Sequence, residues 1–321
     1  MEVVLQHGAR PRQGSSTARW VWRLVVVVLA ALGLGALGLQ APNLEAEEPR
    51  SIHRELPARA AGEVVVELLA GVVEVEGHDE RSIVLDAELG AAVGSLDVLE
   101  DGQRVVVRAK VDDTRRTGEA AAVTLRMKIP KASRVRIQTL DASLRTAGLE
   151  GKLELETVAG EIRVTGATSR EVLVTTATGQ VHLEAPSLRG RVRSASGAVR
   201  VSADVHDLGV VTATADVRVA ASVVEEMELQ TVSGEVELEG TVAPTGRLRV
   251  RSHTGDVRLR LPSDLSAQLR LESRRGRVTN SLGSGGDSVA AQDGGVDLVL
   301  GRGGPSIDVE SLDGDIFVET R

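Results

Sequence analysis

The segment LELETVAGEIRVTG, residues Leu153 to Gly166, decides the fold. Apolar and polar residues alternate on both sides of a Thr-x-x-Gly corner that ends at Gly160. Strict alternation puts one set of side chains inside and the other set in water, as in a β-strand packed on one face. The segment therefore predicts two short strands joined by a tight corner.

The same pattern recurs along the chain at intervals of 18 to 21 residues. We call the corner positions hinges; they are Gly160, Gly179, Gly197, Ala215, Gly234, Gly255, Gly276, Gly294 and Gly314, with Ala142 opening the array. A fixed period of this size is typical of a solenoid, because one unit alone cannot bury its apolar face. The inner positions are mostly β-branched, which favours strands. We predict an all-β, single-stranded β-solenoid of about ten turns over residues 135–321.

A hydroxyl precedes most hinges by three residues, as Thr157 does before Gly160, and its parity is inward. We expect this hydroxyl to bond a turn N–H two residues on, and the glycine to supply a backbone angle that other residues reach only with strain. An ice-binding or ligand-binding threonine array would need to face outward. The inward-facing column of hydroxyl residues is therefore interpreted as part of the core structure and not as a binding site.

The residues before the array predict a cap and a linker. Residues 62–134 contain an isolated copy of the hinge pattern around Gly71 and an Asp101-Gly102 hairpin signal. We predict that they form an N-terminal β cap, which covers an edge that would otherwise pair with other chains. Residues 40–61 are rich in Pro, Ala and charge and are predicted to be a linker.

The N-terminus carries an apolar run, residues 24–39, with Trp20 and Trp22 just before it. The run predicts a transmembrane helix at residues 20–39, a cytoplasmic tail at residues 1–19 and an exported body, because arginines precede it and acids follow it. The predicted location is the cytoplasmic membrane, single-pass, with the C-terminal body periplasmic or extracellular. A cleaved signal peptide with a site at Ala36-Leu37-Gly38 is the alternative.

Composition narrows the possible functions. The chain has no cysteine, which excludes disulfides, thiolate metal sites and a catalytic cysteine. Aromatic residues are 1% of the chain, which suits a thin aliphatic core. The net charge is −8, which argues against nucleic-acid binding because that activity needs a basic surface.

Catalytic patterns are weak. The six histidines show no metal-binding spacing, so no metal or cofactor is predicted. Asp216, Glu235 and Asp256 each follow a hinge and could supply the acid pair of a polysaccharide-cleaving β-helix enzyme. Pairing of these acids with Arg218, Arg200 and Arg258 is the preferred interpretation. We therefore predict that the protein is not an enzyme.

A cluster of arginines is the candidate binding site. The outward parity of two successive turns places there Arg249, Arg251, Arg258, Arg270 and Arg277. Stacked guanidinium groups repel one another unless an anion meets them, and their planar forks suit phosphate or carboxylate. An anionic envelope polymer or a lipid headgroup is the predicted ligand. Pairing of these arginines with Glu228, Glu237 and Glu272 on adjacent turns is the preferred interpretation of the cluster, because charge-rich faces are usually only solvated.

The copies LETVAGEIRV, LQTVSGEVEL and VESLDGDIFV, with the entry Ile129-Pro130, resemble the bacterial "putative adhesin" family of domains of unknown function. The resemblance covers residues 62–321. It implies an extracytoplasmic β-solenoid, often tethered by one membrane helix, with adhesion or envelope-stress roles. It offers no catalytic residues to carry over.

These observations predict a membrane-anchored, extracytoplasmic β-solenoid that acts as a non-catalytic, adhesin-like or envelope interaction module. Its partner would be an envelope polymer or protein. One alternative is a self-assembling envelope scaffold joined end to end, because the chain ends at Phe317 to Arg321 without an evident cap and an open edge can template pairing. A polysaccharide-active enzyme is the other alternative.

Overall fold

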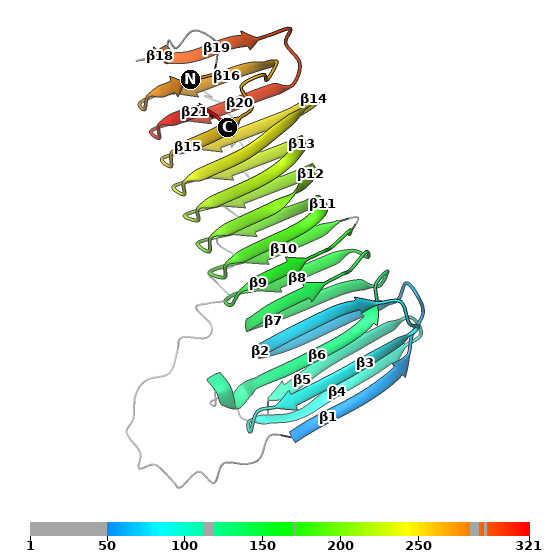
Figure 1. Cartoon of the computed structure of the whole chain (residues 1–321). Helices are drawn as coiled ribbons and strands as arrows, with labels where there is room; N and C mark the ends of the chain where they lie inside the picture. Colours follow the sequence, from blue (N-terminus) through cyan, green and yellow to red (C-terminus); the bar gives the residue numbers. More distant parts are fainter. Residues whose placement is uncertain (1–49, 112–117, 170, 283–288, 292–293) are drawn as a thin grey trace, which may run out of the picture. The chain divides into compact units, whose positions relative to one another are not determined.

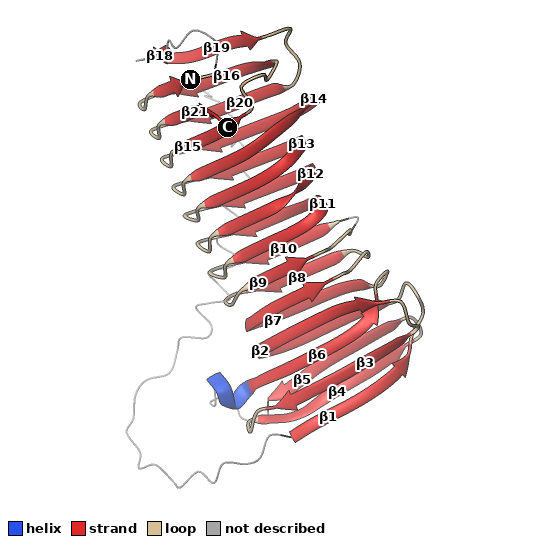
Figure 2. Ribbon diagram, viewed as in Figure 1, coloured by secondary structure: helices blue, strands red, loops and turns tan. Residues whose placement is uncertain are grey.

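The structure is a computed structural model that describes residues 50–111, 118–169, 171–282, 289–291 and 294–321. These residues lie in one compact unit, residues 46–321. The elements described are strands, apart from one short 3-10 helix, η1 (Gly118–Ala121) (Figure 2). The predicted all-β class is therefore confirmed.

The transmembrane part of the fold prediction needs correction. No helix within the described ranges is long and apolar enough to cross a membrane, and η1 has only four residues. Residues 20–39, to which the spanning helix was assigned, lie outside the described residues. The prediction of a single-pass location in the cytoplasmic membrane depended on that helix and is corrected with it.

The strands form two facing stacks, one built from strands that precede a hinge and one from strands that follow it (Figure 1). We call these the pre-hinge layer and the post-hinge layer, and one turn through both layers a rung. Long strands run from the post-hinge layer of one rung into the pre-hinge layer of the next. The central strands are β7 (Arg134–Ala147), β8 (Leu153–Thr157), β9 (Ile162–Thr165), β10 (Val172–Thr176), β11 (Val181–Ser194), β12 (Val199–Thr212), β13 (Val217–Thr231), β14 (Val236–Ser252) and β15 (Val257–Leu261).

Like residues stack on like in the core, as the sequence columns predict. In the pre-hinge layer Leu155 pairs in register with Val174 and Val174 with Val192. In the post-hinge layer Ile162 pairs with Val181, and all five side chains are at most 1% exposed. Burying an aliphatic side chain of this size contributes about 1.5–3 kcal/mol. The stacked columns therefore form one continuous core.

Asn280 is the polar exception in the inner columns. Its side chain is 3% exposed, and its Oδ1 accepts a hydrogen bond of 3.1 Å from the backbone N–H of Leu282. A buried amide with such a partner avoids part of its desolvation cost.

The hinge hydroxyls face inward, as expected, but they bond a different N–H from the one expected. At five rungs the hydroxyl oxygen accepts from the N–H of the hinge glycine itself, three residues on, at 2.9 to 3.1 Å. These acceptors are Thr176, Ser194, Thr231, Ser273 and Ser311, and each is at most 7% exposed. The column thus pairs buried backbone donors that the sheet does not reach.

Close approach between rungs, and not a special backbone angle, explains most hinge glycines. Of the hinges, only Gly71 and Gly160 have positive φ, at 128° and 104°. A Cβ added at Gly197 would lie 1.8 Å from the carbonyl oxygen of Gly179 in the neighbouring rung. The expectation that the glycines supply a special backbone angle is therefore corrected at most hinges, where glycine is needed because a side chain would clash with the neighbouring rung.

The N-terminal strands flank the first rung on its outer side. Strand β2 pairs in parallel with β7 on one side and with β5 and β6 on the other. Strands β4, β3 and β1 then add in antiparallel orientation, and Gly102 at φ 61° forms the predicted hairpin turn between β4 and β5. Their bounds are β1 (Arg50–Pro57), β2 (Glu63–His78), β3 (Ser82–Leu89), β4 (Val93–Asp101), β5 (Arg104–Val111) and β6 (Ala122–Pro130).

The C-terminal rungs do not stack in sequence order. The last two strands insert between the rung of β14 and β15 and the rung of β16 and β17. Strands β18 and β19 then close the far end in antiparallel orientation. The strands are β16 (Ala267–Ser273), β17 (Val278–Asn280), β18 (Val289–Ala291), β19 (Gly294–Leu300), β20 (Ser306–Ser311) and β21 (Ile316–Thr320).

This order corrects two sequence expectations. Gly294 is not a hinge of a parallel rung, because it begins the antiparallel strand β19 and pairs with Ser273. The last residues of the chain are not the end of the stack, since Ile316 lies between Val257 and Val278. The premise that the chain terminus forms an uncapped end is therefore wrong.

Charge on the outer face favours the observed place of the last rung, although Glu310 lies opposite Glu272. Register places Asp308 between Arg249 of β14 and Arg270 of β16. Direct stacking of β14 on β16 in the same register would put these two arginines opposite each other, and like charges directly opposite are destabilising. Asp308 Oδ2 instead lies 3.5 Å from Arg249 Nε, and Glu310 Oε2 lies 3.4 Å from Arg251 Nε.

Candidate anion-binding groove

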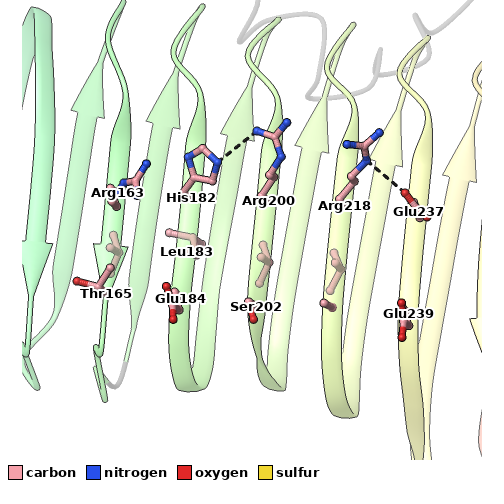
Figure 3. A pocket seen from close by; sticks show the side chains of 14 residues that line it. Arg163, Thr165, His182, Leu183, Glu184, Arg200, Ser202, Arg218, Glu237 and Glu239 are labelled. Carbon is pink, nitrogen blue, oxygen red and sulfur yellow. Dashed lines mark hydrogen bonds and ion pairs between the residues drawn. The ribbon is translucent and has the colours of Figure 1, made fainter.

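A row of cationic side chains follows the outer face of the post-hinge layer. The third residue after the hinge is Arg163, His182, Arg200 and Arg218 in four successive rungs, carried by β9, β11, β12 and β13 (Figure 3). Each residue pairs in register with the next, so neighbouring side chains start about 4.8 Å apart. The strands fix the direction of these side chains, because outer and inner residues alternate.

A second row lies two residues further along the same strands. It contains Thr165, Glu184, Ser202, Ala220 and Glu239 (Figure 3). The small side chains of Ser202 and Ala220 leave a groove of about 440 Å³ between the longer side chains around them. The groove therefore has guanidinium groups along one side and carboxylates and hydroxyls along the other.

Glu161 neutralises one end of the cationic row. Its Oε1 accepts a hydrogen bond of 2.6 Å from Arg163 and lies 3.2 Å from Nδ1 of His182. The Nδ1 contact has the distance of an ion pair but not the alignment of a hydrogen bond, and that atom is buried without another partner. The hydrogen bond from Arg163 lowers the pKa of the Glu161 carboxyl, against an opposing effect of desolvation.

Arg200 differs from the other arginines of the row. Its Nη1 lies 3.2 Å from Nε2 of His182, and no carboxylate oxygen in the described part of the chain lies within 4.0 Å of its guanidinium group. A guanidinium group only donates hydrogen bonds, so Nε2 is the acceptor in this contact. The positive charge of Arg200 is therefore not balanced by a direct carboxylate contact.

Arg218 ends the cationic row with a partner. Its Nε lies 3.2 Å from Oε2 of Glu237, the next residue in the register. Glu237 also accepts a hydrogen bond from Arg260 of β15. The row thus has a shared acid at each end and an arginine without a paired acid between them.

The structure separates the arginines that the sequence grouped into one patch. Arg249, Arg251 and Arg270 lie in the pre-hinge layer, whereas Arg258 lies in the post-hinge layer and Arg277 directly follows the hinge Gly276. Each has an acidic neighbour, and the pairs are Arg249–Asp308, Arg251–Glu228 and Arg251–Glu310, Arg258–Glu235 and Arg258–Glu319, Arg270–Glu272, and Arg277–Asp315. Anion binding at these residues stays a prediction, and an anion there would have to compete with these carboxylates.

The candidate catalytic column is engaged with the backbone. Asp216 accepts a hydrogen bond of 3.0 Å from the N–H of Glu235, and Asp256 accepts one of 2.8 Å from the N–H of Asp315. Glu235 pairs with Arg258 at 2.7 Å. These carboxylates connect neighbouring rungs and do not converge on a shared cavity. Within the described ranges, no group of three or more His, Asp or Glu residues is arranged to hold a metal ion.

The cationic row has a clear signal in the sequence. Aligning the hinge copies shows an arginine or histidine three residues after the hinge in four successive copies. The apolar repetition of the inner columns reports the fold and carries no information on this outer row. The sequence does not show which of these side chains meets an acid, because each acid has more than one basic side chain within reach in the assembled sheet: Glu161 contacts Arg163 and His182, and Glu237 contacts Arg218 and Arg260.

Comparison with family models shows the family of this chain, and comparison with solved structures adds little on function. A family model described as Toastrack DUF4097 matches residues 65–319. A "putative adhesin" from Bacteroides fragilis is 12% identical with a TM-score of 0.46, over 66% of this chain and 97% of that protein. A "putative lipid binding protein" from Parabacteroides distasonis is 11% identical with a TM-score of 0.44, over 85% and 97%. At such identities and TM-scores no property of these proteins is transferred to this chain. No curated protein matches it.

Proposed function

We propose that this chain, which belongs to the Toastrack DUF4097 family, is a non-catalytic, adhesin-like interaction module that binds its partner along the groove of the post-hinge layer. The observation that carries this proposal is the in-register row of Arg163, His182, Arg200 and Arg218 beside an open groove. Side chains held by stacked strands present a fixed pattern of charge, and such preorganisation lowers the cost of binding.

The acids beside the groove support binding over catalysis. A general acid at neutral pH needs a carboxyl whose pKa is raised by burial or by a like charge. Glu161 shows the opposite environment, because Arg163 lowers the pKa of its carboxyl. Glu237 contacts two arginines. The pKa of Glu161 is thus lowered and not raised, and the contacts of Glu237 with two arginines are those of a structural or recognition surface.

A groove-filling variant tests the proposal. Ala220 is exposed in the second row, and Ala220→Trp would fill the space between Ser202 and Glu239. Val211→Trp is the matched control, because Val211 lies in the same rung on the outer side of the pre-hinge layer. We expect fluorescently labelled full-length protein to bind a subset of an array of neutral and acidic glycans, and Ala220→Trp to lose that signal while Val211→Trp keeps it.

Two results would contradict the proposal. If Ala220→Trp and Val211→Trp bound the glycans equally well, the binding site would lie outside the groove. Accumulation of new reducing or unsaturated ends on the bound glycans would show catalysis instead of simple binding.

End-to-end self-association is a second candidate function, and the outer edges of the pre-hinge layer favour it. Within the described residues β4 pairs only with β5, and β19 only with β16. Leu99 on β4 is 56% exposed and Val299 on β19 is 70% exposed. Unpaired strand edges can template pairing with another copy. Sedimentation of the full chain over a hundredfold dilution tests this, and a monomer at every concentration would exclude it.

A further inference from the structure

We propose that the ligand of the groove is a linear, carboxylate-bearing polysaccharide, and that Arg200 is the residue that anchors its carboxylate. This inference rests on the proposed function, because it assigns a ligand class to the same groove. It follows from three features of the described residues: the unbalanced charge of Arg200, the chemistry of the opposite row and the continuation of the groove along the stack.

The charge of Arg200 favours an anion at this position. Its register neighbours are His182 on one side and Arg218 on the other, so it stacks on another cation without an acid of its own. Like charges directly opposite on neighbouring strands are destabilising. Glu161 and Glu237 relieve this repulsion at Arg163 and Arg218 but not at Arg200. A bound carboxylate would relieve it there, through the paired hydrogen bonds that a guanidinium group forms with a carboxylate.

Donors for such a ligand are available at Arg200. The only hydrogen bond of its side chain among the described residues joins Nη1 to Nε2 of His182. A guanidinium group carries five N–H donors in a planar fork. The acceptor at His182 is a ring nitrogen and not a carboxylate, so a ligand carboxylate would form the stronger, charge-assisted hydrogen bond with the same guanidinium group.

The opposite row selects a ligand with many hydroxyls and sparse negative charge. Glu184 and Glu239 flank the small side chains of Ser202 and Ala220, and Thr165 lies at the near end. Carboxylate and hydroxyl oxygens accept hydrogen bonds from sugar hydroxyls. Glu239 pairs with Arg321 at 3.2 Å, whereas Glu184 has no basic side chain within 4.0 Å among the described residues. A polyphosphate or a nucleic acid would bring dense negative charge against Glu184, and nucleic-acid surfaces are basic throughout. A polysaccharide with spaced carboxylates fits both rows.

The groove continues beyond one binding position. A second hollow of about 390 Å³ shares Arg163 and Thr165 with the first and extends over β7, β2 and β6. Arg145 continues the cationic row there and lies in register with Arg163. Two adjacent hollows that share lining residues suit an elongated chain better than a small ion. The inference is therefore a polymer that follows the stack of strands.

The experiment compares one charge substitution with a matched control in the same rung. Arg200→Gln removes the proposed anchor, and Arg193→Gln removes an exposed arginine of that rung from the outer side of the pre-hinge layer. The probe is polygalacturonate, and its fully methyl-esterified form provides the same backbone without charge. Binding to the full-length protein is measured by isothermal titration calorimetry, and thermal unfolding of each variant checks that it is folded.

We expect polygalacturonate to bind and its methyl ester to bind at least tenfold more weakly. Arg200→Gln should weaken polygalacturonate binding about tenfold, which corresponds to the loss of about 1.4 kcal/mol from one charge-assisted hydrogen-bonded pair. Arg193→Gln should leave the affinity within twofold of the wild type.

The other outcomes overturn the inference. Equal binding by Arg200→Gln and wild type would exclude Arg200 as the anchor. Binding of polyphosphate, double-stranded DNA or anionic phospholipid vesicles that Arg200→Gln abolishes, without binding of polygalacturonate, would assign another ligand class to the same groove. The proposed function fails separately, when Ala220→Trp and Val211→Trp bind the glycan array equally.

Discussion

The position of the last rung yields the sharpest prediction, because it opposes what chain order suggests. Ile316 lies five residues before the end of the sequence, where truncation is usually tolerated. The structure places it between Val257 and Val278, and its side chain is fully buried. We predict that Ile316→Ala destabilises the protein as strongly as the same change in the middle of the stack.

The expected magnitude comes from burial on both sides. An Ile→Ala change in a closed core costs about 2–5 kcal/mol, through lost transfer free energy and the cavity that remains. Ile162→Ala is the mid-stack reference, since Ile162 lies between Leu144 and Val181 and is also fully buried. If the last rung formed the end of the stack, one side of Ile316 would face water and roughly half of this cost would be expected.

Chemical denaturation followed by far-ultraviolet circular dichroism measures the three free energies of unfolding that the comparison needs. Val299→Ala is the control, because Val299 lies on the edge strand β19 and is 70% exposed, so its cost should stay within about 0.5 kcal/mol. The refuting result is a cost for Ile316→Ala that resembles that of Val299→Ala while Ile162→Ala shows the full core penalty. That result would mean that the last rung is not inserted.

Three further predictions concern the core, the hinges and pH. Val217→Asp buries an unpaired carboxylate and should cost more than about 4 kcal/mol, whereas Arg218→Asp on the exposed face should change the free energy of unfolding by less than about 1 kcal/mol in the same titration. Gly197→Ala should cost about 1–3 kcal/mol because its Cβ would meet a backbone oxygen at 1.8 Å, whereas Gly209→Ala meets only a flexible arginine side chain and should cost less; equal thermal midpoints for both would contradict this reason. The pKa of Glu161 is lower in the folded than in the unfolded state, so its contribution to stability is complete above the unfolded-state pKa and is lost as pH falls through the folded-state pKa. The thermal midpoint of Glu161→Gln should therefore fall less than that of the wild type between pH 6 and pH 3, and an equal fall would refute this assignment.

Much of the fold follows from local sequence patterns and can be predicted from them. The alternation around each hinge fixes which side chains are inside, and Leu155 and Ile162 lie in the core for that reason. The hydroxyl column is buried as its parity predicts, although the N–H that it bonds is one residue further along than expected. The reason for glycine at most hinges could not be predicted from the sequence, because a Cβ at these positions would clash with the backbone of a neighbouring rung.

In the candidate site, too, part of the geometry follows from local sequence and part depends on contacts between rungs. The outward direction of Arg200 and its neighbours follows from period two and can be seen in the aligned copies. Glu161 precedes Arg163 by two residues and meets it locally, whereas Glu237 occupies the same post-hinge position as Arg218 in the next rung, and the register between β13 and β14 brings those two side chains together. That Arg200 meets no carboxylate among the described residues is a property of the assembled sheet.

The sequence alone determined that this chain forms stacked strands with an aliphatic core, because each unit carries the same alternation and cannot be buried by itself. The order of the last rungs was decided only by the tertiary structure. The inner columns of all rungs are so alike that hydrophobic stacking does not distinguish one neighbour from another. Charge on the outer faces favours the observed order, because Asp308 lies between Arg249 and Arg270 and Glu310 lies beside Arg251. Among the described residues, the position that opposes it is Glu310, which lies opposite Glu272.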